Sequence, residues 1–294
     1  MLYRVTHTTT YDYSESVSLS HNMLRVIARN SLNQQCHRSR LFISPTPASS
    51  TVGEDYFGNP TNFITILDAH KQFRVTAINV TEVHKPHIPD VAQTPPWEHV
   101  RDRLRNDRTE EFLRAYEFVF PSLYIPGLKE FHDYSLVSFR PNRPILEAVL
   151  DLTNRIYSEF TYDPRATSIA TPLREVLDKR KGVCQDFAHL QIGCLRSLGL
   201  AARYVSGYLL TSPPPGQPRL QGADASHAWL SVFVPGTGWI EVDPTNNMIP
   251  SDQHILLAWG RDYDNVGPIR GVITGGGQHT VHVGVDVEEI SHLD

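Results

Sequence analysis

The first 85 residues alternate between apolar and polar side chains, which is the period of a half-buried β-strand. The alternation is clearest in two runs of odd-numbered residues, namely Tyr3, Val5 and His7, and later Phe73, Val75 and Ala77. Turn-forming residues at 56–60, Tyr-Phe-Gly-Asn-Pro, separate such runs. We therefore predict an N-terminal antiparallel β-sandwich over residues 1–85.

Proline interrupts this pattern between residues 86 and 96. The segment contains Pro86, Pro89, Pro95 and Pro96. Prolines so close together stiffen a chain and remove backbone donors, as is typical of a linker. We predict an interdomain linker at 86–96, followed by a second domain over 97–294 that includes the C-terminal strands.

Beyond residue 97 the apolar period becomes helical. After Pro144, apolar side chains recur at helical spacing at Ile145, Ala148, Val149, Leu152 and Ile156. A shorter helix is expected from Thr171-Pro172 to about Arg180, because this pair is a common helix start. Another helix follows Gly182 and ends at Gly199, with Cys184 in its first turn. Separate strand-rich and helix-rich regions indicate an α+β fold.

Two alternating runs follow, on either side of a turn at 235–238, Pro-Gly-Thr-Gly. The first, 227–234, places His227 and Trp229 on one face, and the second, 239–243, places Asp243 on a face with Trp239. A hairpin would bring His227 and Asp243 near one another, although a turn centred on Gly236 and Thr237 leaves them a few residues out of register. The proline-rich stretch 212–218 before the hairpin is expected to be a loop.

Composition and charge exclude several classes of function. The 294 residues are 40% hydrophobic and 20% charged, a normal globular balance. The net charge of −5 lacks the basic excess that nucleic-acid binding requires. No apolar stretch is long enough to span a membrane, and the N-terminus lacks a signal-peptide pattern, so we expect a cytoplasmic protein without membrane contacts. Three cysteines do not form a disulfide framework.

The candidate chemistry lies in a thiol, an imidazole and a carboxylate in chain order: Cys184, His227 and Asp243. A helix start stabilises a thiolate through unpaired N–H groups and the helix dipole, and a neighbouring imidazolium would add to this. The arrangement indicates nucleophilic catalysis through a thioester. Asp186 would repel the thiolate unless another group engages its carboxylate.

Three segments in order, GVCQDFAHL, LRSLGLAARYVSGYL and SHAWLSVFVPGTGWIEVDPT, resemble the core of the transglutaminase-like superfamily. The N-terminal β-module and the segment 254–263 also resemble the bacterial branch that carries an extra N-terminal domain. The resemblance implies a papain-like core in which a helix bearing the cysteine packs on an antiparallel sheet bearing the histidine and the aspartate.

The resemblance also implies roles. Cys184 would attack an amide carbonyl, His227 would act as general base and then acid, and Asp243 would orient the imidazole. The backbone N–H of Cys184 would be one oxyanion donor. Papain-like enzymes place a glutamine six residues before the cysteine, but Asp178 stands there, and Tyr162 is the alternative donor. Trp229 and Trp239 are candidate lining residues of an acyl tunnel, or core residues.

Three classes of function remain open. The first is an amide hydrolase or acyltransferase acting on a peptide or protein amide, with hydrolysis the leading subtype and no cofactor. The second is an inactive peptide-binding scaffold that retains the fold. The third is a metal site built from Cys184, His227 and Asp243. The pairs His84/His87 and His279/His282 lack a metal-binding motif, and the glycine run 275–277 is interpreted as a connection between two C-terminal strands.

Overall fold

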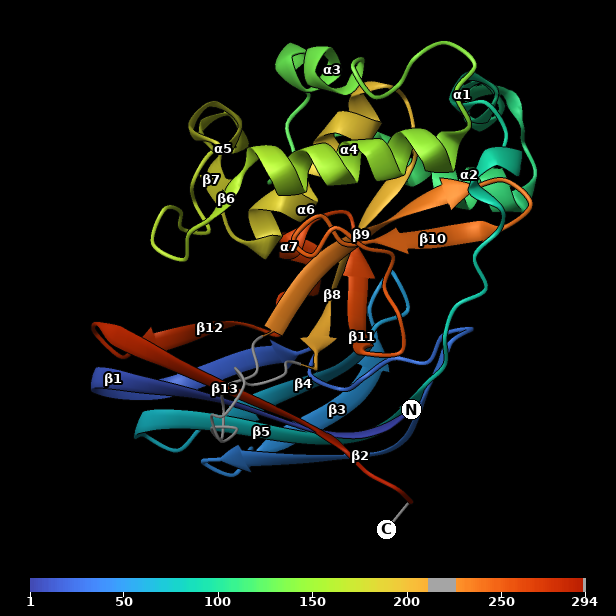
Figure 1. Cartoon of the computed structure of the whole chain (residues 1–294). Helices are drawn as coiled ribbons and strands as arrows, with labels where there is room; N and C mark the ends of the chain where they lie inside the picture. Colours follow the sequence, from blue (N-terminus) through green and yellow to red (C-terminus); the bar gives the residue numbers. More distant parts are fainter. Residues whose placement is uncertain (211–225, 293–294) are drawn as a thin grey trace, which may run out of the picture.

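A computed structural model describes residues 1–210 and 226–292. A layer of long strands lies below a helical region, and a smaller sheet lies between the two (Figure 1). The loop expected at 212–218 lies outside the described residues. None of the helices within the described ranges is long and apolar enough to cross a lipid bilayer.

The N-terminal strands form one large antiparallel sheet, in the order β2-β5-β1-β4-β3, with β12 and β13 also paired to β1. Its strands are β1 (Leu2–Leu24), β2 (Gln34–Ser44), β3 (Ser49–Glu54), β4 (Pro60–Ile66), β5 (His70–Val83), β12 (Ile269–Gly275) and β13 (His279–Glu289). The alternation of the sequence reappears as alternating burial along β1 and β5.

Strand β1 changes partners halfway along its length. Its first half pairs with β5 and β13, whereas its second half pairs with β4 and β12. The register with β5 shifts between Asp12 and Val17, as in a β-bulge, which bends a strand. Side chains of both halves share one apolar cluster, for example Ile64 and Ile66 of β4 with Phe73 and Val75 of β5. The antiparallel β-sandwich predicted for residues 1–85 takes the form of a single antiparallel sheet, curved like a half-barrel around its own core.

The C-terminal strands belong to this sheet and not to the core domain in which the division at 97–294 placed them. Residues 3–13 of β1 pair with β13, and Val17 to Leu24 pair with β12. The glycine run 275–277 does connect these two strands, with positive φ at all three residues. The chain thus returns to its first strand, and such long-range pairing leaves no local signal in the sequence.

The second region packs helices against a four-stranded antiparallel sheet of order β10-β9-β8-β11. Its strands are β8 (Ala202–Leu209), β9 (Ser226–Val234), β10 (Gly238–Val242) and β11 (His254–Gly260). Its helices are α1 (Trp97–Asn106), α2 (Glu110–Tyr116), α3 (Lys129–Ser135), α4 (Ile145–Glu159), α5 (Leu173–Lys179), α6 (Cys184–Ser197) and α7 (Tyr263–Val266). Short elements complete it: 3-10 turns η1 (Val91–Gln93) and η2 (Glu117–Val119), and strands β6 (Thr161–Tyr162) and β7 (Lys181–Gly182).

Helix α6 is the centre of this core. It is buried from Asp186 to Arg196 and contacts β8, β9 and α3. The predicted helices after Pro144 and Pro172 and the predicted hairpin are all present, as α4, α5 and β9–β10. Four apolar side chains of β9 join the same core cluster as α6, namely Ala228, Leu230, Val232 and Val234. The α+β fold class is confirmed.

The two regions dock through strand β11, which is an edge strand of the smaller sheet. The Gln34 side chain donates to the Leu256 carbonyl and accepts from its N–H, both at 2.7 Å. Asn59 does the same for Trp259, at 2.8 and 3.0 Å. Two amide side chains thus satisfy backbone groups that an edge strand would otherwise leave unpaired. The small sheet is thereby fixed against the β-module.

Gly207 should be indispensable to this arrangement. It pairs with His227 of β9 and with Leu256 of β11, and a Cβ there would collide with the Ile255 carbonyl oxygen and the Trp229 ring. We expect Gly207→Ala to lower the free energy of unfolding by roughly 3 kcal/mol, measured by urea denaturation. Gly53→Ala is the matched control, because its Cβ would meet only the Thr61 hydroxyl at 3.8 Å. Equal stability of the two variants would contradict the close packing.

Candidate active site

Cys184 is the first residue of α6 and is partly exposed. The carboxylate of Asp186 turns back over the helix start, where it accepts hydrogen bonds from the Val183 N–H at 2.9 Å and the Thr167 hydroxyl at 2.6 Å. A side chain at Gly182 would come within 2.8 Å of that carboxylate. Asp186 is therefore engaged as a helix cap, and the repulsion considered from the sequence is relieved.

His227 and Asp243 meet across the hairpin, even though the strand register does not pair them. The last pair of the hairpin is Val242 with Leu230, so Asp243 lies just beyond β10, where it forms a β-bridge with Met248. His227 lies near the start of β9, opposite Gly207 of β8. The His227 Nε2 and Asp243 Oδ2 atoms are nonetheless 2.7 Å apart, because the side chains reach diagonally across the ribbon.

The Asp243 carboxylate is fully buried and accepts an unusually complete set of hydrogen bonds. Its Oδ1 accepts from the backbone N–H groups of Thr245 and Asn246, at 2.9 and 3.2 Å. Its Oδ2 accepts from Asn246 Nδ2 at 2.7 Å and from His254 Nε2 at 3.1 Å, besides His227. Burial alone would raise the pKa of Asp243, but the bonds to His227 and His254 outweigh it and hold the pKa well below its usual range. The group is a carboxylate at neutral pH.

His227 is correspondingly held in its charged form. Burial disfavours the imidazolium, but hydrogen bonds to Asp243 and to the Cys184 side chain raise the pKa of His227 to about 10. Because Asp243 engages Nε2, Nδ1 is the ring nitrogen left for the thiol. The structure therefore brings all three predicted residues together, in the order Cys184, His227, Asp243.

Trp229 packs against the His227 and His254 rings and is buried, so it does not line a tunnel. It is fully buried, stacks against His227 with ring centroids 5.8 Å apart, and contacts the His254 ring edge-to-face at 5.2 Å. Its indole N–H donates to Glu241 at 2.8 Å. The strand pattern gives the face of Trp229 correctly, but the sheet is covered there, so the lining role predicted for it is wrong.

Trp239 lines a cavity other than the one at Cys184. Its ring contacts Phe118 and Phe233, and the Arg203 guanidinium lies 4.4 Å above it. The described residues that line the cleft at Cys184 do not include Trp239, and its acyl-tunnel role stays a prediction.

Tyr162 lies beside the thiol without lining its cavity. It follows Thr161 in β6 and pairs with Gly182 of β7, two residues before Cys184. Its ring centroid lies 6.4 Å from that of Phe187 in α6. Burial, and then the neighbouring Cys184, raise the pKa of Tyr162, although half of the side chain is exposed. Its role as an oxyanion donor stays a prediction.

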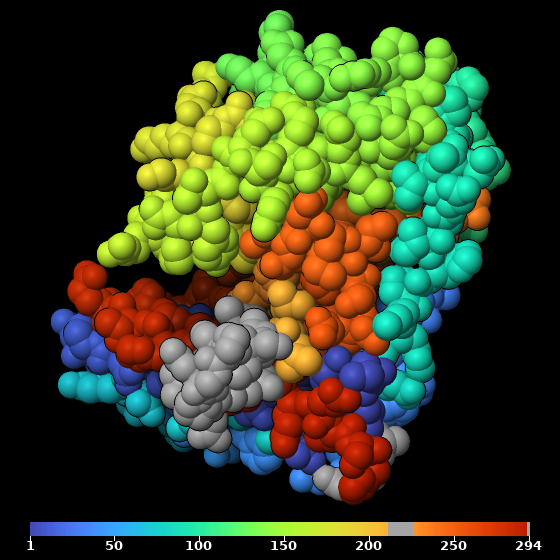
Figure 2. All heavy atoms as spheres, viewed as in Figure 1, coloured from blue at the N-terminus to red at the C-terminus, as the bar shows by residue number. Residues whose placement is uncertain are grey.

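Cys184 and His227 open into a cleft of about 220 Å³ between the two regions. The opposite wall comes from the β-module: His7, Thr9 and Tyr11 of β1, with Val281 and Val283 of the paired strand β13. The core side contributes Gln185, Tyr204, Ser206, Ser226, Ala228 and Tyr263, and Pro268 and Ile269 close the rim. Figure 2 shows an indentation between the yellow-green helical region and the red C-terminal strands.

The wall opposite the thiol is neutral. His7 bonds the Tyr208 hydroxyl at 2.7 Å and the Thr9 hydroxyl at 2.9 Å. Burial lowers the pKa of His7 to about 4, so its imidazole is uncharged at neutral pH. The cleft therefore offers hydroxyls, a neutral imidazole and two valines to whatever approaches Cys184.

Metal binding was the third interpretation of the sequence, through Cys184, His227 and Asp243. Among the described residues, the only group with three ligand atoms close together is His227, Asp243 and His254, within 4.8 Å of one another. Both imidazoles already form hydrogen bonds to the Asp243 carboxylate, and the Cys184 thiol is not part of the group. The three side chains form a hydrogen-bonded network. A metal ion bound here would have to displace both imidazoles from the Asp243 carboxylate.

Sequence reasoning missed three side chains at this site: Thr167, His254 and Asn246, whose amide donates to Asp243. Thr167, which engages Asp186, has no local motif around it. His254 lies in the segment 254–263 that carried the family resemblance, but nothing in its spacing pointed to Asp243. It reaches the carboxylate because β11 pairs with β8, placing His254 opposite Leu209.

Two known protein families match this chain, one in the N-terminal β-module and the other in the helical region with the smaller sheet. Residues 3–82 match the bacterial transglutaminase-like N-terminal region, and residues 137–244 match the transglutaminase-like superfamily. An uncharacterized protein of Mycobacterium tuberculosis is 40% identical over 294 residues, covering 97% of this chain and 92% of its own length.

Two further likenesses cover different parts of the chain. A protein-glutamine gamma-glutamyltransferase of Pseudomonas aeruginosa is 32% identical over 107 residues, which are 36% of this chain and 16% of that protein. The crystal structure of a candidate cysteine protease from Cytophaga hutchinsonii matches with a TM-score of 0.74, over 100% of this chain and 92% of its own, at 20% identity. The structural match establishes the shared fold.

Proposed function

Because the chain belongs to the transglutaminase-like superfamily, we propose that it is an enzyme that cleaves or exchanges amide bonds through a thioester on Cys184. The observation that carries this proposal is the contact of the Cys184 thiol with an imidazole whose pKa is raised to about 10 by Asp243 and by the thiol itself, against the effect of burial. An imidazolium beside a thiol favours the thiolate, which is the nucleophilic form.

The reaction divides into two steps. In the first, the Cys184 sulfur attacks the amide carbonyl carbon, the carbon–nitrogen bond breaks, and His227 gives its proton to the departing amine. A thioester and a neutral imidazole result. In the second step, water or an amine attacks the thioester, His227 takes up a proton from it, and the thiolate leaves to restore the starting pair. Asp243 keeps Nε2 protonated throughout, so Nδ1 alone exchanges the proton with the reactants.

The cleft favours an uncharged acyl group. Among the described residues of the facing wall none is charged at neutral pH, and Val281 and Val283 offer exposed aliphatic surface. A glutamine-type side-chain amide or a peptide bond meets these conditions, and the relative from Pseudomonas aeruginosa is named for the glutamine reaction. Hydrolysis is the leading subtype, and transfer to an amine differs only in the group that resolves the thioester.

The test is to trap the acyl-enzyme. The protein is mixed with a peptide library, quenched in acid, and analysed by mass spectrometry after proteolysis. We expect an added acyl mass on the peptide containing Cys184, released by hydroxylamine, and none in Cys184→Ala. The adduct identifies the substrate class directly. Capture of peptides without any covalent adduct, equal in the two proteins, would instead indicate the non-catalytic scaffold.

A further inference from the structure

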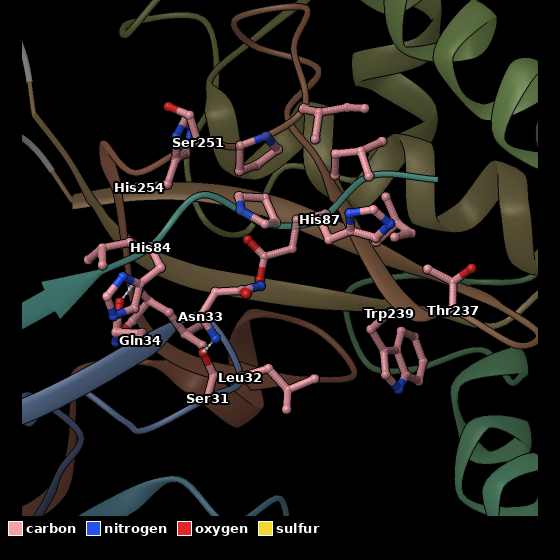
Figure 3. Close-up of a pocket in the computed structure, with 18 of the residues that line it drawn as sticks. Ser31, Leu32, Asn33, Gln34, His84, His87, Thr237, Trp239, Ser251 and His254 are labelled. Carbon is pink, nitrogen blue, oxygen red and sulfur yellow. Dashed lines mark hydrogen bonds between the residues drawn. The ribbon is translucent and has the colours of Figure 1, made fainter. Parts of the chain in front are cut away.

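A second cavity, of about 390 Å³, has His254 among its lining residues. It shares no lining residue with the cleft at Cys184. The segment after β1, the chain following β5, the β9–β10 turn and the start of β11 surround it, and Figure 3 shows His254, His84, His87 and Trp239 among its side chains. Its size falls within the range of small-molecule sites.

His254 connects this cavity to the candidate active site. Its Nε2 bonds Asp243 at 3.1 Å, and its Nδ1 has no hydrogen-bond partner within the described part of the chain, although the side chain is only 1% exposed. A carboxylate can only accept, so Nε2 carries the proton. In the tautomer that carries its proton on Nε2, the Nδ1 atom keeps a free lone pair. Its Nδ1 is therefore a buried acceptor without a donor.

Glu241 supplies a second acceptor to the same cavity. One of its oxygens accepts the Trp229 indole N–H at 2.8 Å. Burial raises the pKa of Glu241, whereas the Trp229 hydrogen bond and the charge of Arg203 lower it. The guanidinium of Arg203 lies between Trp239 and Trp259, 4.4 and 3.7 Å above the rings, and donates to the Ser231 hydroxyl. Arg203 therefore acts on Glu241 through its charge, and its hydrogen bond goes to Ser231. A buried carboxylate is stabilised by a cation that donates hydrogen bonds to it directly.

We propose that this cavity binds an organic cation with more than one N–H donor, a guanidinium or primary ammonium group on an apolar stem. The charged group would donate to Glu241 and to His254 Nδ1, as the fork of a guanidinium can. The stem would lie against apolar lining residues, which include Ile240, Ile249 and Leu256.

Other ligand classes fit less well. An anion would face Glu241. A metal ion would need three ligand atoms together, and within the described ranges the cavity offers no such group of its own, although His84 and His87 both line it. These two histidines follow the end of β5 at Val83.

We expect a cation bound in the cavity to change the reactivity of the Cys184 thiol. A donor on His254 Nδ1 polarises the ring and strengthens its Nε2–H bond to Asp243. The carboxylate then holds the His227 imidazolium less strongly, and the thiolate that depends on it is less favoured. The cation is thus expected to slow reactions of Cys184 without entering its cleft.

Binding is tested with butylguanidinium, which stays protonated at neutral pH and so is no acyl acceptor. By isothermal titration we expect a Kd of about 1 mM or lower for the full chain, also after alkylation of Cys184, and none for butanol or butyrate. Glu241→Gln should weaken binding at least about tenfold. The matched control is Glu111→Gln, an exposed residue of α2, which should bind as the natural chain does. Equal binding to both variants, or equal binding of butanol, would refute the site.

Coupling is tested separately by the rate of Cys184 alkylation at pH 7. Saturating butylguanidinium should slow it at least about twofold in the natural chain and in Glu111→Gln, and should leave it unchanged in Glu241→Gln. Binding with an unchanged rate would refute the coupling through His254. Neither measurement needs an amide substrate, so failure here is distinct from failure to trap an acyl-enzyme.

Discussion

Iodoacetamide is expected to alkylate Cys184 at pH 6 at least about 100-fold faster than either of the other two thiols. At the other two cysteines burial outweighs the neighbours that favour a thiolate. Burial raises the pKa of Cys194 to about 12, and burial also raises the pKa of Cys36. Cys184 instead contacts the His227 imidazolium and is partly exposed in the cleft. Peptide mapping by mass spectrometry, with time courses from pH 5.5 to 9, measures the three rates in one sample.

The three cysteines act as internal controls, because each experiences the same reagent and pH. The His227→Ala variant completes the comparison, since it removes the imidazolium and leaves the helix start unchanged. In that variant the alkylation profile of Cys184 should move to higher pH, towards that of a free cysteine, about 8.5. Three thiols that label alike at every pH, or a profile that His227→Ala does not move, would contradict an activated nucleophile.

Local patterns were sufficient to predict the elements that carry the site. The helix start at Cys184 and the His227 strand are each specified within a few residues, by Gly182, the β-alternation and the Pro-Gly-Thr-Gly turn. The hairpin brings His227 and Asp243 together because neighbours in a hairpin are neighbours in sequence. Their register, two residues from direct pairing, still permits contact through the side chains.

Long-range contacts were not predictable in this way. Strand β13 lies beside β1 although Glu289 and Tyr3 are separated by almost the whole chain. The wall of the cleft that faces Cys184, including Thr9 and Val283, depends on that pairing. The alternation of a strand predicts which side chains share a face, but the burial of Trp229 depends on which elements cover that face. His254 reaches Asp243 only because β11 pairs with β8.

Replacing Asp243 by asparagine should lower the rate of Cys184 acylation on the order of 10³-fold or more. The amide keeps the size of the side chain but removes the charge that holds His227 as an imidazolium and fixes its tautomer. Burial, the largest influence on His227, would then be opposed mainly by the thiol, so the pKa of His227 should fall well below its value of about 10. Acylation by the peptide identified in the trapping experiment, with a parallel NMR titration of the histidines, measures both effects.

The His227–Asp243 pair should make the free energy of unfolding of the natural chain fall as the pH rises. The stabilisation from protonated His227 is fully present below the unfolded pKa of about 6.5, and it is lost as the pH rises towards 10, because folding must then take up a proton. The natural chain should therefore exceed Asp243→Asn in free energy of unfolding by a margin that shrinks as the pH rises from about 6.5 to about 10. The expected decrease in this margin is on the order of 2 kcal/mol.

Asp68→Asn is the matched control, because it makes the same chemical change at an exposed position between β4 and β5, and Asp68 lines neither cavity. It should change neither the acylation rate nor the pH dependence of unfolding. An Asp243→Asn protein that acylates normally would remove the carboxylate from the mechanism. A stability difference that does not change from pH 6.5 to 10 would mean that Asp243 does not hold His227 charged, and the thiolate would then depend on the helix start alone.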